Sequence, residues 1–108
     1  MKRTLLAILL FCGLIGARAQ QPGTSFRFAF VSDTHVGSPD GKAEEDLRRT
    51  VADINRQTGI AFVVLTGDIT ELGTNEELRR AKQILDSLHI PYYIIPGNHD
   101  TGWSESGG

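Results

Sequence analysis

The stretch IAFVVLTGD, residues 60–68, decides the fold of this 108-residue chain. Its first seven residues are apolar or β-branched, a composition that favours a strand over a helix. The run then stops at Gly67 and Asp68, a dipeptide that is typical of a turn. The sequence therefore predicts a buried strand over residues 60–66 that ends in a turn with an acidic side chain.

Helical patterns flank this strand on both sides. Between residues 42 and 57 the apolar side chains recur at helical spacing, and Gly59 follows where a helix C-terminal glycine belongs. The recurring residues are Leu47, Val51 and Ile54. After the strand, residues 74–77 (TNEE) form a capping box, which predicts that a second helix starts there. The expected apolar stripe of that helix is Leu78, Ala81, Leu85 and Leu88.

Two further strands complete the pattern. Residues 26–32 are nearly all apolar, as expected for a strand that is buried on both faces. Pro91 forbids continuation of the second helix, and residues 92–95 are the third predicted strand. The order strand, helix, strand, helix, strand, with short links, indicates an α/β fold with a parallel β-α-β-α-β sheet and right-handed crossovers.

A polar cluster follows each of the three predicted strands. In chain order the clusters are Asp33-Thr34-His35, Gly67-Asp68 and Gly97-Asn98-His99-Asp100. Parallel strands direct their carboxyl ends to one edge of the sheet, where α/β proteins bind ligands, so the clusters are expected to meet. Carboxylate, amide and imidazole donors suit Mn²⁺, iron or Zn²⁺, and the lack of a thiolate among them argues against a structural zinc site.

Each cluster also has a simpler explanation as a turn. Asp33 alone could cap a turn after its strand, and Gly67-Asp68 is ordinary turn chemistry. Gly97-Asn98 suits a turn as well, but a turn has no need of His99 and Asp100 after them. Three such clusters at three successive strand ends are therefore better explained by one shared site than by three separate turns.

Together the clusters resemble the motifs of the calcineurin-like metallophosphoesterases, which are Asp-x-His, Gly-Asp and Gly-Asn-His followed by Asp or Glu. The resemblance extends from Phe26 to Asp100, and each motif matches. It implies that the chain forms the N-terminal part of a four-layer α/β/β/α sandwich. It also implies a hydrolase that cleaves phosphoester bonds of small-molecule substrates at a centre of two divalent metal ions, with Mn, Fe and Zn as the candidates.

The resemblance further implies a role for each motif residue. The implied metal ligands are Asp33, His35, Asp68 and Asn98, of which the first two bind one ion, the third bridges both and the last binds the second. His99 would lie beside the substrate phosphate and protonate the leaving oxygen, and Asp100 would orient His99. Elementary chemistry agrees with these roles, because bridged cations acidify the attacking water and an imidazolium relieves charge on the leaving group.

The family draws further metal-binding histidines from later in the chain, whereas this chain has only His35, His89 and His99. We therefore expect residues 20–108 to be the N-terminal part of a domain whose C-terminal half is missing, and to be a poor enzyme alone. Two alternatives stay open. One is a non-catalytic metal- or nucleotide-binding α/β module, although the chain has no Walker or dinucleotide fingerprint. The other is an inert fragment that cannot fold alone.

The N-terminal residues predict export. Lys2 and Arg3 precede an apolar run over residues 5–15, and Ala17-Arg18-Ala19 matches a signal cleavage site. These features predict a signal peptide over residues 1–19 and cleavage before Gln20, with an uncleaved membrane anchor as the alternative. We expect the mature protein to be periplasmic or secreted and not attached to the membrane.

The mature chain is expected to be acidic and to lack cysteine. The only cysteine, Cys12, leaves with the signal peptide, and so do three of the 11 Lys and Arg side chains, so that eight remain against 13 acidic ones. A nucleic-acid surface would need a basic patch, which this composition does not provide. The composition therefore predicts no nucleic-acid partner, and the resemblance implies a small phosphoester as the substrate.

Overall fold

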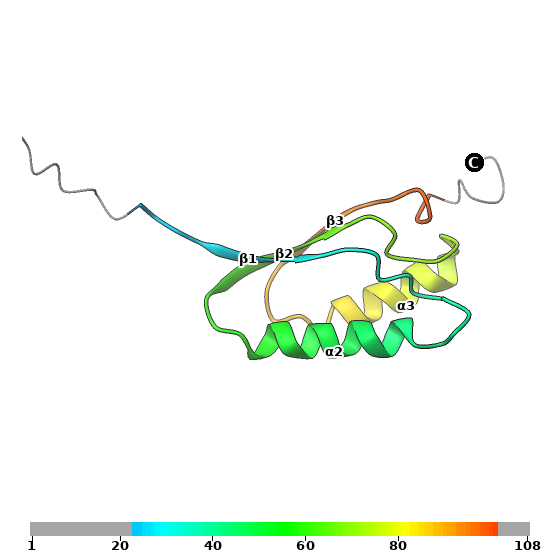
Figure 1. Cartoon of the computed structure of the whole chain (residues 1–108), viewed down its shortest axis with the longest axis horizontal. Coiled ribbons are helices and arrows are strands. Elements are labelled where there is room, and N and C mark those ends of the chain that lie inside the picture. Colours follow the sequence, from blue (N-terminus) through cyan, green and yellow to red (C-terminus); the bar gives the residue numbers. More distant parts are fainter. Residues whose placement is uncertain (1–22, 102–108) are drawn as a thin grey trace, which may run out of the picture.

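A computed structural model describes residues 23–101 of the chain, and the predicted order of elements is confirmed (Figure 1). The elements are β1 (Arg27–Val31), α2 (Ala43–Arg56), β2 (Ile60–Thr66), α3 (Asn75–Leu85) and β3 (Tyr92–Ile95). The signal peptide predicted over residues 1–19 and the cleavage site before Gln20 lie outside the described residues. Neither of the described helices has the length and apolarity that crossing a membrane requires.

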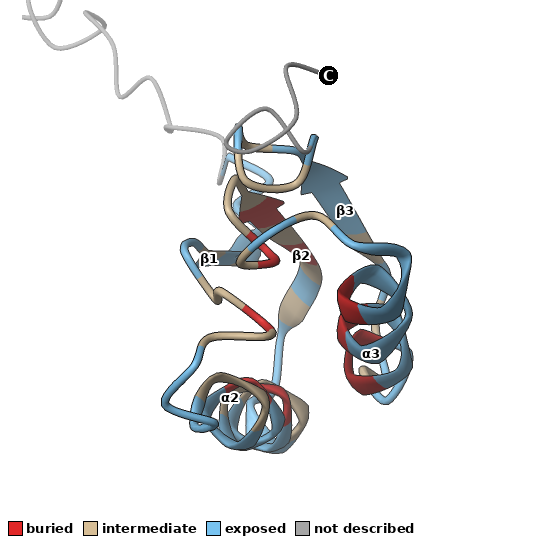
Figure 2. Ribbon diagram, turned by 90° about the vertical axis from the view of Figure 1, so that its right-hand side faces the viewer, coloured by how far each residue is buried: buried red, intermediate tan, exposed pale blue. Residues whose placement is uncertain are grey.

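The three strands form a parallel sheet in the order β1-β2-β3, with β2 in the centre. Phe30 of β1 pairs with Val64 of β2, which in turn pairs with Tyr93 of β3. Both helices lie on the same face of this sheet, where α2 and α3 also contact each other (Figure 2). The predicted α/β class and the parallel β-α-β-α-β arrangement are thus confirmed.

The core lies between the helices and the sheet. Val63 and Leu65 of the central strand are buried, whereas the intervening Val64 is only partly buried, which is the alternation of a strand with one covered face. The buried apolar residues are Val36, Leu47, Val51, Val63, Leu65, Ile69, Ala81, Ile84 and Leu85. The predicted core positions Leu47, Val51, Ala81 and Leu85 are therefore confirmed.

The expected apolar stripe of α3 is wrong at Leu78, which is 39% exposed. The buried face of this helix is centred on Ala81 and includes Glu77 and Ile84, while Leu78 lies at the margin of that face. There it lines a cavity beside Ile94 on β3, which is the edge strand of the described sheet. The helical spacing identified the apolar side of α3 but not which margin of that side would be covered.

The expectation that the first strand is buried on both faces is also wrong. Phe28 is 50% exposed and Phe30 is 66% exposed, and on β3 the exposed fraction of Tyr93 is 60%. The reason is that both helices occupy one face of the sheet (Figure 2). The strand residues on the opposite face, which no other described residue covers, are left exposed. We call this the aromatic face and define it by Phe26, Phe28, Phe30, Phe62 and Tyr93. Phe28 and Phe62 stack on it with ring centroids 5.3 Å apart.

The predicted capping box at the start of α3 is confirmed. The Thr74 hydroxyl accepts a hydrogen bond from the Glu77 N–H at 3.2 Å, and the Glu77 carboxylate accepts one from the Thr74 N–H at 3.1 Å. Glu77 is almost completely buried, and its carboxylate also accepts from the Leu72 N–H at 3.0 Å. These N–H donors satisfy a buried charge and fix the end of the loop that follows β2.

Candidate metal centre

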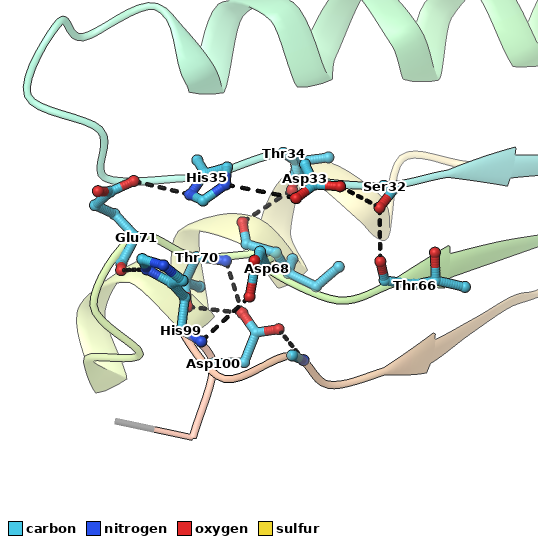
Figure 3. Close-up of polar contacts among 12 residues, drawn as sticks. Ser32, Asp33, Thr34, His35, Thr66, Asp68, Thr70, Glu71, His99 and Asp100 are labelled. Carbon is cyan, nitrogen blue, oxygen red and sulfur yellow. Dashed lines mark hydrogen bonds and ion pairs between the residues drawn. The ribbon is translucent and has the colours of Figure 1, made fainter. Parts of the chain in front are cut away.

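The loops after the three strands are hydrogen-bonded to one another beyond the ends of the sheet. The His35 N–H donates to the Asp68 carbonyl at 3.0 Å, which joins the first loop to the second. The Gly67 N–H donates to the Ile95 carbonyl at 2.7 Å, which joins the second loop to the third strand. The three predicted clusters therefore lie together at one edge of the sheet, which we call the carboxyl edge (Figure 3).

Three non-glycine residues in these loops have positive φ angles. They are Asp33 at 55°, His35 at 44° and Asp68 at 49°, and all three are predicted metal ligands. Residues with a side chain rarely adopt this region, and such strain is found preferentially at functional sites. Asp and His are enriched among the non-glycine residues in this region, and here all three are positions from which predicted ligands project.

The structure brings the side chains of Asp33, His35 and Asp68 together. One ligand atom from each lies within 4.8 Å of the others. The His35 Nε2 lies 3.8 Å from an Asp33 carboxylate oxygen. A metal ion about 2.1 Å from each donor fits among atoms at these separations with small adjustments of the side chains. Two carboxylates and an imidazole therefore fit a divalent cation such as Mn²⁺, iron or Zn²⁺.

Asn98 lies in the third loop, in the turn that follows β3, and its side chain is exposed. The main-chain carbonyl of Asn98 accepts a hydrogen bond from the Thr101 hydroxyl at 3.1 Å. The side-chain amide of Asn98 makes no hydrogen bond to another described residue. The next residue ties this loop to the centre, because the His99 N–H donates to the Asp68 carboxylate at 3.2 Å. The structure thus places Asn98 in a loop next to Asp68 with its amide available.

The His99 imidazole is held by the second loop. Its Nδ1 lies 2.5 Å from the carbonyl oxygen of Glu71, and its ring meets the ring of His35 edge-on at 5.1 Å (Figure 3). The hydrogen bond to this carbonyl raises the pKa of His99 most, burial opposes the rise, and the charges of Asp68, Glu71 and Asp100 add to it. The hydrogen bond and these charges thus act in favour of the charged form of the ring.

Asp100, the residue expected to orient His99, makes its hydrogen bonds to the second loop and to Gly97. One of its carboxylate oxygens accepts from the N–H of Thr70 at 2.7 Å and from the hydroxyl of Thr70 at 2.9 Å. The other accepts from the Gly97 N–H at 2.8 Å. Burial acts to raise the pKa of Asp100, but these hydrogen bonds outweigh it and the pKa is lowered. Asp100 thus ties the third loop, which carries His99, to the second loop.

The sequence reasoning missed Glu71. Its carboxylate lies 2.9 Å from the Nδ1 of His35, so this residue contacts both imidazoles of the centre. One signal was available, because a metal-bound imidazole usually donates its second nitrogen to a carboxylate or a carbonyl. An acidic residue three positions after Asp68 in the same loop was a candidate for that partner.

Comparison with known proteins supports a phosphoesterase centre. Residues 26–108 match the family model described as calcineurin-like phosphoesterase. The chain is 39% identical over 77 residues to a probable glycerophosphodiester phosphodiesterase of Arcobacter nitrofigilis, and 39% identical over 79 residues to a glycerophosphodiester phosphodiesterase of Enterobacter lignolyticus. It is also 32% identical over 80 residues to a probable cyclic nucleotide phosphodiesterase of Rhodopseudomonas palustris.

These matches involve most of this chain but a minor part of each relative. They cover 65%, 67% and 68% of the chain, and 28%, 28% and 29% of the respective relatives. The chain therefore spans less than a third of the length of the curated relatives it matches.

Proposed function

Because the chain belongs to the calcineurin-like phosphoesterase family, we propose that its carboxyl edge is part of the active site of a metal-dependent phosphodiesterase. The observation that carries the proposal is the convergence of Asp33, His35 and Asp68 from two separate loops, each with a positive φ angle. Asp is a usual residue at left-handed turn positions, but turns alone do not require that two carboxylates and an imidazole meet within 4.8 Å of one another.

The ligand assignment follows the family motifs. Asp33 and His35 would hold one ion, Asp68 would be shared by both ions, and Asn98 would bind the second, which fits the convergence of the first three residues and the free side-chain amide of Asn98. When bound, the two ions supply an acidified water and polarise the phosphoryl group. The donor set admits Mn²⁺, iron and Zn²⁺.

His99 is the proton donor in this proposal. Its Nδ1 faces the Glu71 carbonyl, which can only accept, so that nitrogen carries a hydrogen and Nε2 is the nitrogen available to a substrate. From there Nε2–H can protonate the oxygen of the departing alcohol. The orientation of His99, whose Nε2 stays free beside the predicted metal ligands, favours the hydrolase over a module that only binds a metal or a nucleotide.

We propose phosphodiesters as the substrate class. The relatives from Arcobacter nitrofigilis and Enterobacter lignolyticus are named for glycerophosphodiesters, and that from Rhodopseudomonas palustris for cyclic nucleotides. Both substrates have one phosphorus bonded to two ester oxygens. The small size of the matched share of each relative supports a second proposal, that further metal ligands and a second sheet over the aromatic face come from other parts of the domain.

The assay that tests the proposal compares two diesters whose leaving groups differ. The substitution His99→Ala is expected to leave the metal content unchanged and to reduce turnover of a glycerophosphodiester about 100-fold or more, because an alkoxide must be protonated as it leaves. Turnover of bis(4-nitrophenyl) phosphate should fall much less, because nitrophenolate leaves with little help from an acid. Steady-state kinetics with Mn²⁺, together with elemental analysis of the metal, measure both effects.

His89→Ala is the matched control, because His89 is an exposed histidine outside the three loops. Equal losses on both substrates would remove His99 from the role of acid, and loss of metal would make it a ligand. The assay uses this chain together with the other parts of its domain, because the chain alone is expected to be a poor enzyme. If that metal-loaded protein turns over neither diester, the proposed function itself is refuted.

We also propose that residues 1–19 direct export and are then removed, which Lys2, Arg3 and the apolar run over residues 5–15 support. Exported protein is expected to begin at Gln20. Intact-mass measurement of protein recovered from outside the cytoplasm decides this, because a mass that includes residues 1–19 would identify the segment as an anchor.

A further inference from the structure

Glu71 contacts the imidazole of His35 with its side chain and the imidazole of His99 with its main chain. Its carboxylate lies 2.9 Å from the His35 Nδ1, and its backbone carbonyl lies 2.5 Å from the His99 Nδ1 (Figure 3). We propose that Glu71 is a positioning residue that orients the metal ligand with its side chain and the proton donor with its main chain. This inference rests on the proposed function, from which His35 and His99 take those roles.

The carboxylate contact determines which nitrogen of His35 can bind a metal. A carboxylate only accepts hydrogen bonds, so the His35 Nδ1 that faces it carries the hydrogen. Nε2 then has the free lone pair, and it is this atom that lies 3.8 Å from the Asp33 carboxylate. A carboxylate behind a ligand imidazole fixes the orientation of its ring and increases its basicity. Glu71 thus turns the lone pair of His35 toward the predicted metal position.

The main-chain carbonyl of Glu71 likewise fixes the tautomer of His99, and this contact does not depend on the side chain of Glu71. The Glu71 N–H donates to the carbonyl of Val36 at 2.9 Å, and Val36 is completely buried. The main chain at Glu71 is therefore anchored to the core, and its carbonyl has a fixed direction. With its Nδ1 bonded to this carbonyl, His99 has only Nε2 free to meet a substrate.

The division between side chain and main chain allows one substitution to separate the two functions. Removal of the carboxylate by Glu71→Ala leaves the peptide carbonyl in place. His35 should then lose its fixed tautomer while His99 keeps its own. A residue needed only for folding would disturb both rings together or neither of them.

The experiment uses the whole protein and has two readouts. In metal-free protein, ¹⁵N NMR of the imidazoles is expected to show His35 with hydrogen on Nδ1 in the wild type and a mixture of both tautomers in Glu71→Ala. His99 should stay unchanged. Calorimetric titration with Mn²⁺ is expected to show affinity reduced about 10- to 100-fold in Glu71→Ala. Glu71→Gln, whose amide oxygen can still accept from Nδ1, should restore the tautomer and part of the affinity.

Glu76→Ala is the control, because Glu76 is an exposed glutamate at the start of α3 and should change neither readout. If Glu71→Ala does not fold, Glu71→Met, which keeps the length of the side chain, carries the same expectations. Wild-type tautomers together with wild-type Mn²⁺ affinity in the folded variant would overturn the inference. The NMR readout needs neither metal nor turnover, so it tests Glu71 even if the assay of diester hydrolysis refutes the proposed function.

Discussion

Substitution of Asp68 by Asn is expected to reduce phosphodiester turnover by about three powers of ten while the fold stays intact. Asp68 is the only predicted ligand assigned to both metal ions, and loss of its charge removes several kcal/mol of electrostatic stabilisation from the proposed centre. Asn is nearly the same shape and tolerates a positive φ angle, which at this position is 49°. Its amide oxygen can also still accept the hydrogen bond from the His99 N–H. The substitution therefore removes the charge and little else.

Measurement of bound metal per chain and of turnover with excess Mn²⁺ checks this prediction. Bound metal is expected to fall from two ions toward one or none. Asp53→Asn on α2 is the matched control, because this exposed aspartate pairs only with the neighbouring Arg56 and should leave metal and turnover unchanged. Full turnover by Asp68→Asn would show that the centre does not depend on a bridging carboxylate.

Substitution of Gly97 by Ala is expected to destabilise the protein by about 1–3 kcal/mol and to weaken metal binding with it. A Cβ on Gly97 would overlap both the backbone nitrogen and the carboxylate of Asp68, and it would lie 2.9 Å from the Cα of Gly67. The φ angle of Gly97 is not in the positive range, so the cost is a steric clash and not backbone strain. Because two of the clashing atoms are main-chain atoms, no rotation of a side chain can relieve the contact.

Urea denaturation and Mn²⁺ titration of Gly97→Ala measure the two effects. Gly23→Ala is the control, because a Cβ at Gly23 would meet nothing within 4 Å. If Gly97→Ala has wild-type stability and metal affinity, the third loop can move away from Asp68 at no cost. The close approach of these loops would then have no part in building the centre.

The sequence predicted the strands and helices well because their signals are local. The run over residues 60–66 and the capping box at Thr74 each determine an element within one short segment, and both are found as expected. Which face of the sheet is covered is a different question, because it depends on the side of the sheet on which the helices pack. Phe28 and Phe30 are apolar whether one layer or two surround the sheet, so the sequence could not predict that the described residues leave one face of the sheet exposed.

The candidate site shows the same division. Asp33, His35 and Asp68 were predicted because motif spacing and the geometry of parallel strands are enough to bring them together. The contact between His99 and the Glu71 carbonyl could not be predicted from the sequence, because every residue has a main-chain carbonyl. The direction of this one depends on the three-dimensional path of the loop. The hydrogen bonds of Asp100 to Thr70 and Gly97 are likewise a product of how two loops meet.

The alternation of buried and partly buried side chains along β2 also fixes the position of the proposed metal centre. Val63 and Leu65 fit into the core, and the chain continues from them to Asp68 in only three residues. A slip of β2 by one residue would expose both of these side chains and would shift Asp68 by about 3.3 Å, more than the length of a bond between a metal and its ligand. Any error large enough to misplace the carboxylate would therefore first have to break the core. The spacing of the proposed metal centre is thus protected by the same apolar contacts that keep the chain folded.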